Sequence, residues 1–563
     1  APPLSIRSCR LDYGGVIDNE TKQFDDILET ISGDILYIVD PFLLDQLLYS
    51  SVLKKDTKYC KLSKEQISCD RDTVVFLLQA VVSTTHLAAY QIRRLKEEKE
   101  TRQFHIVFCP NKTMMCSQCL REDKVLGDVT IHSATFNTIP LEEDLVSQEI
   151  ENAFTRLYLK QDHTLLPTVI QQIYQLQQLS AGINEVHGLG ERAIFVMETL
   201  QKQKKLPQIP RHGKSVIRHL ILIDRAVDFS SLFVTPLSYE GLIDQLLHIH
   251  AGGIEVPATM IGRHDDGTIE VNLNNDDYLF SEIRDDNICV IPQELQKKLY
   301  QIQTEQMQET SEGKKPSKMD AFDRLQIHQG ISDFITSVTN GYMFRQQWQM
   351  EHEILNGEQL LDYIVERITL QDTLPRIMQL LCLYSLVNGG LRSKDYDTVR
   401  KEIIQTYGYE NLLFLNQLER SGLFARREGG RNYSAIRNKL QLVKDVDGEN
   451  QAEMHYVTSG YAPISVRLVE WILREGRLPP DVSRLVGCEY EHDVVGSSSN
   501  AVRPVIVVYF IGGVTYTEIA ALRYLAKKEG FGADLIILTT NIVNGSRILE
   551  ELKSTEPMKL PPV

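Results

Sequence analysis

Residues 505–513 read VIVVYFIGG and are followed by a helical pattern, TEIAALRYLAKKEG (517–530), and by a second apolar run, DLIILTT (534–540). Both runs are almost continuously apolar and rich in β-branched residues, as parallel strands covered on both faces are. One strand–helix–strand unit cannot close a core by itself, so these strands need a partner elsewhere in the chain. The economical partner is HLILID, residues 219–224. The sequence therefore predicts one α/β domain built from two distant segments.

A separate α/β domain is expected at the N-terminus. Its candidate strands are ILYIVD (35–40), VVFLL (74–78) and HIVFC (105–109). Amphipathic stretches such as HLAAYQIRRLKEEKETR (86–102) lie between them. This alternation predicts a parallel sheet with crossover helices.

The segments between these strands suggest three domains, one of them discontinuous. A helical pattern fills about 145–205, and most of the region after residue 245 is helical too. LPRIM (374–378) opens an apolar helix that ends at Asn388-Gly389-Gly390, with proline and glycine at the expected ends. The predicted organisation is domain 1 at 1–139 (α/β), domain 2 at 140–245 and 462–563 (α/β), and a mainly helical domain 3 at 246–461.

Composition narrows the classes of function. The 563 residues are 42% hydrophobic and 24% charged, which indicates a globular chain. Sixty Lys and Arg against 76 Asp and Glu give a net charge of -16, which disfavours nucleic acid and anionic lipid as partners. The longest apolar run is about half of what a bilayer needs, so any membrane contact should be peripheral and made through partners. Nine scattered cysteines indicate a reducing compartment such as the cytoplasm.

Motifs that could carry catalytic chemistry are weak. FIGGVT (510–515) resembles a phosphate loop but lacks the Lys-Ser/Thr of a Walker motif, and tight strand-to-helix packing is the alternative. HGLGER (187–192) has two of the three glycines of a dinucleotide fingerprint and no clear strand before it. Cys116 and Cys119 have the spacing of half a zinc site, without a second pair at useful spacing. No catalytic residue, metal or cofactor is expected, and a nucleotide-binding enzyme is a disfavoured alternative.

The run Asp224-Arg225-Ala226-Val227-Asp228 follows a predicted strand. It could form a carboxylate pair at the carboxyl edge of a sheet, where ligands of α/β proteins bind. Alternatively, the guanidinium of Arg225 ties both carboxylates and nearby carbonyls together at a domain junction. The structural interpretation is favoured because no nucleophile or base lies nearby in the sequence.

Two long runs together resemble a known family. Residues 221–247, ILIDRAVDFSSLFVTPLSYEGLIDQLL, combine a strand with D-R-x-x-D, T-P and Y-E-G. Residues 508–525, VYFIGGVTYTEIAALRYL, carry G-G-x-T-x-x-E-I-x-A-L-R. In this order they are similar to the signatures of the SM (Sec/Munc) family of SNARE-binding proteins. The signature positions, interpreted as structural, are Asp224, Arg225, Asp228, Pro236, Tyr239, Glu240, Gly241, Gly512, Gly513, Thr515 and Glu518.

Three further runs, residues 402–423, 429–440 and 456–470, are typical of the vacuolar sorting branch of that family. The resemblance implies an arch of three domains without enzymatic activity. It also implies binding to SNARE proteins, as Qa and R type motifs and as the assembled bundle, and promotion of their assembly in fusion with endosomes, lysosomes or the vacuole. A further implication is membership of a class C tethering complex (HOPS), through a partner resembling vacuolar protein sorting-associated protein 16. The expected location is cytoplasmic, peripheral on late endosome, lysosome or vacuole membranes. A scaffold subunit that has lost SNARE binding is the alternative.

The resemblance also implies where SNARE proteins bind. A SNARE motif is an amphipathic helix, so its receptor needs a long groove with apolar stripes and polar rims. The family places that groove between the first domain and a helical hairpin of the third, and the resemblance implies that this hairpin spans about residues 291–340 here. The alternative for an apolar stripe is packing of one hairpin arm on the other. The candidate SNARE-binding residues are Lys298, Tyr300, Gln303, Met307, Arg324 and His328.

A second apolar strip is the candidate tethering-partner interface. Tyr433, Ile436 and Leu440 fall at i, i+3 and i+7 on a short predicted helix with basic residues around them. Aromatic and aliphatic anchors with an arginine rim are typical of interface centres. The alternative is that all three side chains point into the core of the protein's own third domain.

Overall fold

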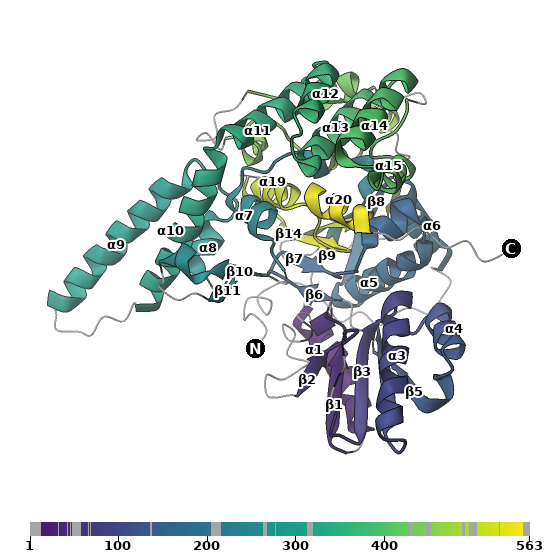
Figure 1. Ribbon diagram of the computed structural model, residues 1–563. Helices are drawn as coiled ribbons and strands as arrows, with labels where there is room; N and C mark the ends of the chain where they lie inside the picture. The colour runs from purple at the N-terminus through teal and green to yellow at the C-terminus, as the bar shows by residue number, and fades with distance from the viewer. Residues whose placement is uncertain are drawn as a thin grey trace. The chain divides into compact units, whose positions relative to one another are not determined.

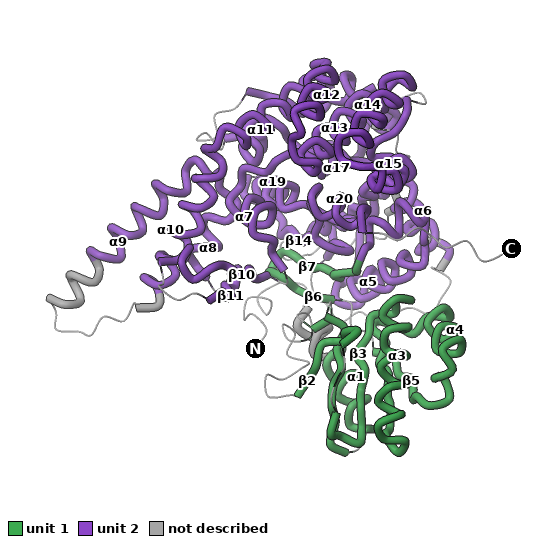
Figure 2. Tube along the Cα trace, viewed as in Figure 1, with its two compact units in different colours: residues 1–151 green, residues 152–563 purple. Residues whose placement is uncertain are grey.

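In the computed structural model the chain forms two compact units, residues 1–151 and 152–563 (Figure 2). The structure describes residues 13–31, 33–41, 43–44, 47, 58–65, 67, 69–134, 138–203, 216–250, 252–262, 267–275, 277–311, 319–427, 432–445, 452–486, 490–494, 504–528 and 530–554. Within these ranges, no helix has the length and apolar character needed to cross a bilayer. The predicted boundaries of the three domains stay a prediction.

The first unit is built on a five-stranded parallel sheet in the order β2-β1-β3-β4-β5. The three predicted strands are confirmed as β1 (Ile35–Val39), β3 (Thr73–Gln79) and β4 (Gln103–Cys109). The sequence pattern does not reveal the edge strands β2 (Tyr59–Lys61) and β5 (Val129–Ser133), because they are partly exposed and lack a long apolar run. The unit also contains α1 (Tyr13–Glu29), α3 (Val82–Glu98), α4 (Met114–Glu122) and the antiparallel pair β6 (Ile139–Pro140) and β7 (Leu145–Ser147).

The second unit contains the sheet that the sequence predicts from distant segments. β9 (Val216–Asp224) pairs in parallel with β13 (Val505–Ile511), which pairs in parallel with β14 (Asp534–Thr539). Residues 505–511 are all buried, as strands covered on both faces must be. The predicted partnership of HLILID with the C-terminal strands is therefore confirmed.

The predicted continuous helical pattern over about 145–205 is wrong in its middle. α5 (Leu166–Leu179) and α6 (Glu191–Gln203) flank β8 (Gly182–Leu189), which pairs in parallel with β9 and antiparallel with β12 (Tyr490–Val494). The sequence GINEVHGL hides this strand because it contains two glycines and several polar residues, which are poor strand formers. HGLGER therefore does follow a strand and open a helix, contrary to expectation.

The remainder of the second unit is mainly helical, as predicted. α13 (Leu374–Asn388) ends at Gly389 with a left-handed φ of 64°, a conformation that glycine adopts without steric cost. The region also contains an unpredicted antiparallel pair, β10 (Gly253–Pro257) and β11 (Thr268–Asn272). Its helices are α7 (Tyr239–Leu247), α8 (Tyr278–Ile283), α9 (Ile291–Ser311), α10 (Met319–Thr339), α11 (Tyr342–Leu355), α12 (Leu361–Thr369), α13 (Leu374–Asn388), α14 (Ser393–Tyr407), α15 (Asn411–Arg420), α16 (Tyr433–Leu440), α17 (Ile464–Glu475) and α18 (Pro480–Val486), followed by α19 (Tyr516–Lys527) and α20 (Gly545–Ser554) in the C-terminal segment. α9 and α10 pack side by side as the predicted hairpin (Figure 1).

Candidate functional site

A buried ion pair joins the two sequence signatures. Arg225 directly follows β9, and its two terminal nitrogens donate to the two carboxylate oxygens of Glu518 in α19, at 2.6 and 2.8 Å. Both side chains are fully buried. Burial alone would lower the pKa of Arg225, but the charge and hydrogen bonds of Glu518 raise it above its ordinary value, so the guanidinium stays charged. The D-R-x-x-D and G-G-x-T-x-x-E motifs are thus the two halves of one bidentate pair.

Glu518 also closes the N-terminus of α19. Its Oε2 accepts from the backbone N–H of Thr515 at 3.0 Å, while the hydroxyl of Thr515 accepts from the N–H of Glu518 at 3.2 Å. This is a capping box. The carboxylate therefore occupies the end of the helix at which an anionic ligand would bind.

Arg225 forms an ion pair with Asp228, as expected, whereas the carboxylate of Asp224 is held by other partners. Asp224 accepts from the Tyr158 hydroxyl at 2.6 Å and from the backbone N–H groups of Ala226 and Arg192, each at 3.0 Å. Burial, followed by the neighbouring Asp224 carboxylate, raises the pKa of Tyr158 well above its ordinary value, so the phenol remains a donor. Because Asp224 binds the first turn of α6, a second helix N-terminus is occupied by a carboxylate of the chain itself.

Asp228 is held by serines. Its Oδ1 accepts from Ser230 Oγ at 2.9 Å and from the backbone N–H of Ser231 at 3.0 Å. Its Oδ2 accepts from the N–H of Ser465 at 3.1 Å and lies 3.8 Å from Arg225. Asp228 thereby connects the turn after β9 to the start of α17, and its carboxylate is buried rather than part of an exposed acidic pair.

The glycines of the second motif allow close packing. Gly512 and Gly513 have φ values of 98° and 108°. A Cβ on Gly512 would lie 2.5 Å from the Tyr158 hydroxyl oxygen, and one on Gly513 would lie 2.6 Å from a methyl group of Val543. This favours the packing interpretation of FIGGVT over a phosphate loop.

The remaining signature residues hold α7 in place. Glu240 is buried and accepts from Arg284 Nε at 3.1 Å and from Arg523 Nη1 at 3.2 Å. A Cβ on Gly241 would lie 2.7 Å from the Pro236 ring, so only glycine fits there without a shift.

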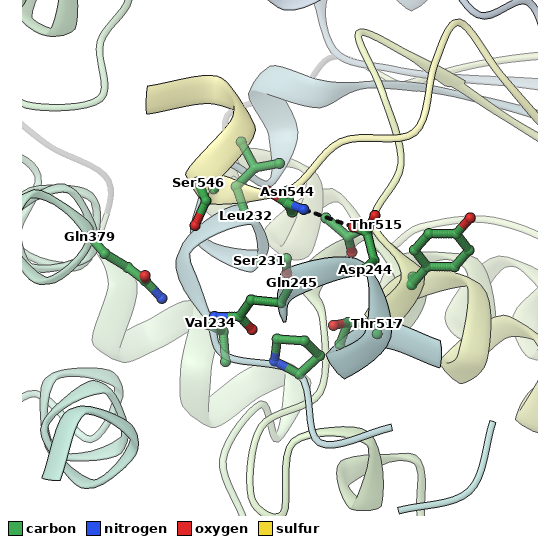
Figure 3. Close-up of a pocket in the computed structure, with 14 residues that line it drawn as sticks. Ser231, Leu232, Val234, Asp244, Gln245, Gln379, Thr515, Thr517, Asn544 and Ser546 are labelled. Atoms are coloured by element: carbon green, nitrogen blue, oxygen red, sulfur yellow. Dashed lines mark hydrogen bonds between the residues drawn. The ribbon is translucent and has the colours of Figure 1, made fainter. Parts of the chain in front are cut away.

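A pocket lies beside this network (Figure 3). Its walls mix hydroxyl, amide and apolar groups, and the signature residues Pro236, Gly241 and Thr515 contribute to them. Asp244, which also lines it, accepts hydrogen bonds from Asn544 at 2.7 Å and from Arg547 at 2.6 Å. The acid of the pocket is thus neutralised by the chain itself.

All six predicted SNARE-binding residues lie on the α9–α10 hairpin. The side chain of Tyr300 is 71% exposed and Gln303 is exposed. Lys298 and Arg324 are half-buried, and Lys298 forms an ion pair with Glu282 of α8 at 2.5 Å. The side chain of Met307 lies outside the described residues.

The prediction that His328 contacts a SNARE protein is wrong, because the side chain of His328 is buried inside the protein. It is fully buried in α10, with Nδ1 3.0 Å from the Tyr239 hydroxyl and Nε2 3.0 Å from Asp277 Oδ2. Its ring stacks on Phe280 with centroids 5.8 Å apart. Burial would raise the pKa of Asp277, but the hydrogen bond and charge of His328 contribute to a net lowering below its usual value. His328 therefore attaches the hairpin to α7 and α8.

The prediction of an exposed tethering-partner interface on α16 is also wrong. α16 forms as expected, but Tyr433, Ile436 and Leu440 are all buried. Burial raises the pKa of the Tyr433 phenol, with Asp228 adding to it and Arg437 opposing it. The three side chains belong to the protein's own core, which was the alternative left open by the sequence.

The candidate SNARE-binding residues do not include Phe322 of α10. Phe322 is 42% exposed, whereas Leu325, three residues later on the same helix, is buried. Helical spacing identifies a face but does not tell where along the hairpin the covering partner ends. Phe322 and Tyr300 are thus two exposed aromatic side chains of the hairpin.

Comparisons with a family model and with individual proteins point to the same family. The model of the Sec1 family matches residues 39–551. The vacuolar protein-sorting-associated protein 33 homolog of Arabidopsis thaliana is 30% identical, over 97% of this chain and 98% of its own length. Vacuolar protein sorting-associated protein 33A of Rattus norvegicus is 32% identical, over 86% of this chain and 87% of its own.

Solved structures share the fold. The chain from the Unc18–syntaxin 1 complex of Monosiga brevicollis superposes with a TM-score of 0.59 at 15% identity, covering 96% of this chain and 98% of that one. The SM protein Vps45 in complex with the Qa SNARE Tlg2 superposes with a TM-score of 0.56 at 14% identity, covering 96% and 97%.

Proposed function

The chain belongs to the Sec1 family, and from that membership we propose that it is a non-enzymatic SNARE-binding protein that promotes SNARE assembly in fusion with endosomes, lysosomes or the vacuole. The observation that carries this proposal is the family match over residues 39–551. Relatives named for vacuolar protein sorting support the branch, and the complexes of similar folds with syntaxin 1 and Tlg2 support a SNARE as the ligand.

The hairpin supports the same ligand on physical grounds. Leu295, Ile302 and Leu325 are buried, so one side of the hairpin stabilises the helices. Tyr300 and Gln303 are exposed on α9, and Phe322 is exposed on α10. Aromatic and polar side chains on a helical surface suit an amphipathic helix, which presents apolar and polar stripes together.

The absence of enzymatic activity is part of the proposal. The two glycine-containing turns that could bind phosphate each lead into a helix. At the N-terminus of each helix a backbone N–H group already donates to a carboxylate of the chain, Asp224 at α6 and Glu518 at α19. A second negative charge at either place would be repelled and would have to displace buried hydrogen bonds. A nucleotide-binding enzyme is therefore disfavoured.

We also propose that the chain is a subunit of a class C tethering complex, with a partner resembling vacuolar protein sorting-associated protein 16. The relatives' names support this assignment. Such a partner would hold the chain peripherally on late endosome, lysosome or vacuole membranes. Because Tyr433, Ile436 and Leu440 are buried, the partner must use other side chains.

The decisive experiment is titration calorimetry of the full chain with soluble SNARE motifs, singly and as an assembled bundle. We expect binding with a negative heat-capacity change from apolar burial. Tyr300→Asp should weaken binding on the order of 10-fold or more, as loss of an exposed interface aromatic does. Tyr409→Asp is the matched control, because Tyr409 is 81% exposed but lies outside the hairpin.

Three results would contradict parts of the proposal. Absence of binding to every motif and to the bundle, in a chain that still binds the tethering partner, would leave a scaffold subunit. Equal weakening by Tyr300→Asp and Tyr409→Asp would remove the hairpin as the SNARE-binding surface. A rise in the melting temperature on addition of nucleotides would support the alternative of a nucleotide-binding enzyme.

A further inference from the structure

We propose that Glu185, His187 and His219 form a Zn²⁺ site in the sheet of the second unit. Oε2 of Glu185 lies 3.0 Å from Nδ1 of His219 and 3.6 Å from Nε2 of His187. The two ring nitrogens are 3.2 Å apart. Two imidazoles and one carboxylate are a set of protein ligands found in zinc sites that keep an open position.

The spacing of the three atoms fits one zinc ion. Ligand nitrogens and oxygens lie about 2.0–2.2 Å from Zn²⁺, so at tetrahedral angles they are separated by about 3.3–3.6 Å. Of the three observed separations, 3.6 Å lies in that range, and 3.2 and 3.0 Å are shorter than it by a few tenths of an ångström. Small side-chain rotations would place all three atoms on one ion.

The sheet explains why these side chains meet. The register pairs Glu185 of β8 with His219 of β9, and His187 is two residues beyond Glu185 on the same face of its strand. β12 pairs with β8 along the edge away from β9, and its register places His492 opposite His187.

The burial of the three side chains would hold an ion in place and still leave it accessible from solvent. His187 and His219 are buried, whereas the side chain of Glu185 is 31% exposed. Polar groups on the buried face of a parallel sheet cost free energy unless they are paired. A divalent cation would stabilise both imidazoles and the carboxylate at once, and the partly exposed side chain of Glu185 gives it an entry path.

The alternative is a hydrogen-bonded chain of two histidines and one glutamate without a metal. The first unit offers a comparison, since His105 Nδ1 and His132 Nε2 are also 3.2 Å apart. Among the residues that the structure describes, however, only Glu185, His187 and His219 bring three metal-ligating side chains this close together. The pair in the first unit therefore serves as a control for simple histidine pairing.

The test is titration of the metal-free full chain with Zn²⁺ by calorimetry, with Co²⁺ as a spectroscopic probe. We expect one Zn²⁺ per chain, a rise in melting temperature with added Zn²⁺, and the visible absorption bands of tetrahedral cobalt. Glu185→Gln and His219→Gln should each weaken binding by at least the roughly 10–100-fold that loss of an outer-shell partner costs. His132→Gln should bind as the wild type does.

Three outcomes would overturn the proposal. They are absence of Zn²⁺ binding by the wild type, unchanged binding by a folded Glu185→Gln variant, and equal weakening by His132→Gln. If His219→Gln fails to fold, Glu185→Gln decides, because its side chain is partly exposed and the substitution preserves its shape.

Discussion

Glu351 of α11 is a fully buried carboxylate at the junction of three segments. It accepts from the backbone N–H and hydroxyl of Thr235, at 2.8 and 3.0 Å, and from Gln379 of α13 at 2.9 Å. Burial raises the pKa of Glu351 to about 7, against the opposing effect of the hydrogen bonds from Thr235. The folded protein therefore holds a proton there that the unfolded chain releases at lower pH.

This predicts a pH dependence of stability. Between the ordinary glutamate pKa and about 7, the folded state binds more protons than the unfolded state, so the free energy of unfolding falls as pH rises. The contribution of Glu351 to the free energy of unfolding should fall by about 3 kcal/mol across that range of pH. Glu351→Gln should remove this part of the slope, and chemical denaturation at about pH 5 and about pH 8 would measure it.

The control for this prediction is Glu366→Gln, on the exposed side of α12. It should leave the slope unchanged. A Glu351→Gln variant with the same pH dependence as the wild type would show that this carboxylate does not hold a proton in the folded state.

Among the individual elements, α16 shows how an apolar strip can mislead. Its spacing of i, i+3 and i+7 is the same for a helix that faces a partner and for one that faces its own domain. In the structure Tyr433, Ile436 and Leu440 are buried, and the Tyr433 hydroxyl has no hydrogen-bond partner among the described residues.

Two substitutions of Tyr433 are therefore expected to change the free energy of unfolding in opposite directions. Tyr433→Phe should raise the free energy of unfolding by about 1 kcal/mol, because it removes a buried hydroxyl without a partner among the described residues. Tyr433→Asp should lower it by about 3 kcal/mol or more, because it buries a charge and opens a cavity. Chemical denaturation measures both. Wild-type stability of Tyr433→Asp would mean that the side chain reaches solvent, and would restore the interface interpretation.

Over the molecule as a whole, the second unit depends on pairing between distant segments. β9 and β13 pair along their length, and Arg225 after β9 binds Glu518 after β13. Without the C-terminal segment, β9 would lose a neighbouring strand and Arg225 would be left buried without its carboxylate. An unpaired buried charge is strongly destabilising.

A chain that ends at residue 461 should therefore fail to fold its second unit. We expect loss of soluble, monodisperse protein in size-exclusion chromatography, and recovery when residues 462–563 are co-expressed as a separate chain. Removal of residues 555–563 alone, after α20, is the control and should be tolerated. A soluble 1–461 fragment with native circular dichroism would contradict the prediction.

Local sequence patterns were enough to predict the α/β and helical regions, the partnership of the C-terminal strands with HLILID and the apolar helix at 374–388, whereas the hairpin at about 291–340 was implied by the family resemblance. Buried strands, amphipathic helices and their end residues leave periodic patterns that can be read without any knowledge of contacts. The two family signatures were also legible, since they are short and specific runs.

The role of each signature residue and of each apolar strip emerged only from contacts between distant segments. Arg225 meets Glu518, and His328 meets Asp277, across long stretches of sequence. Similar helical spacing served a buried face in α16 and a partly exposed one at Phe322. Periodicity in a sequence defines which residues share a face, whereas burial and pairing depend on which distant segment covers that face, and this is set by packing in three dimensions.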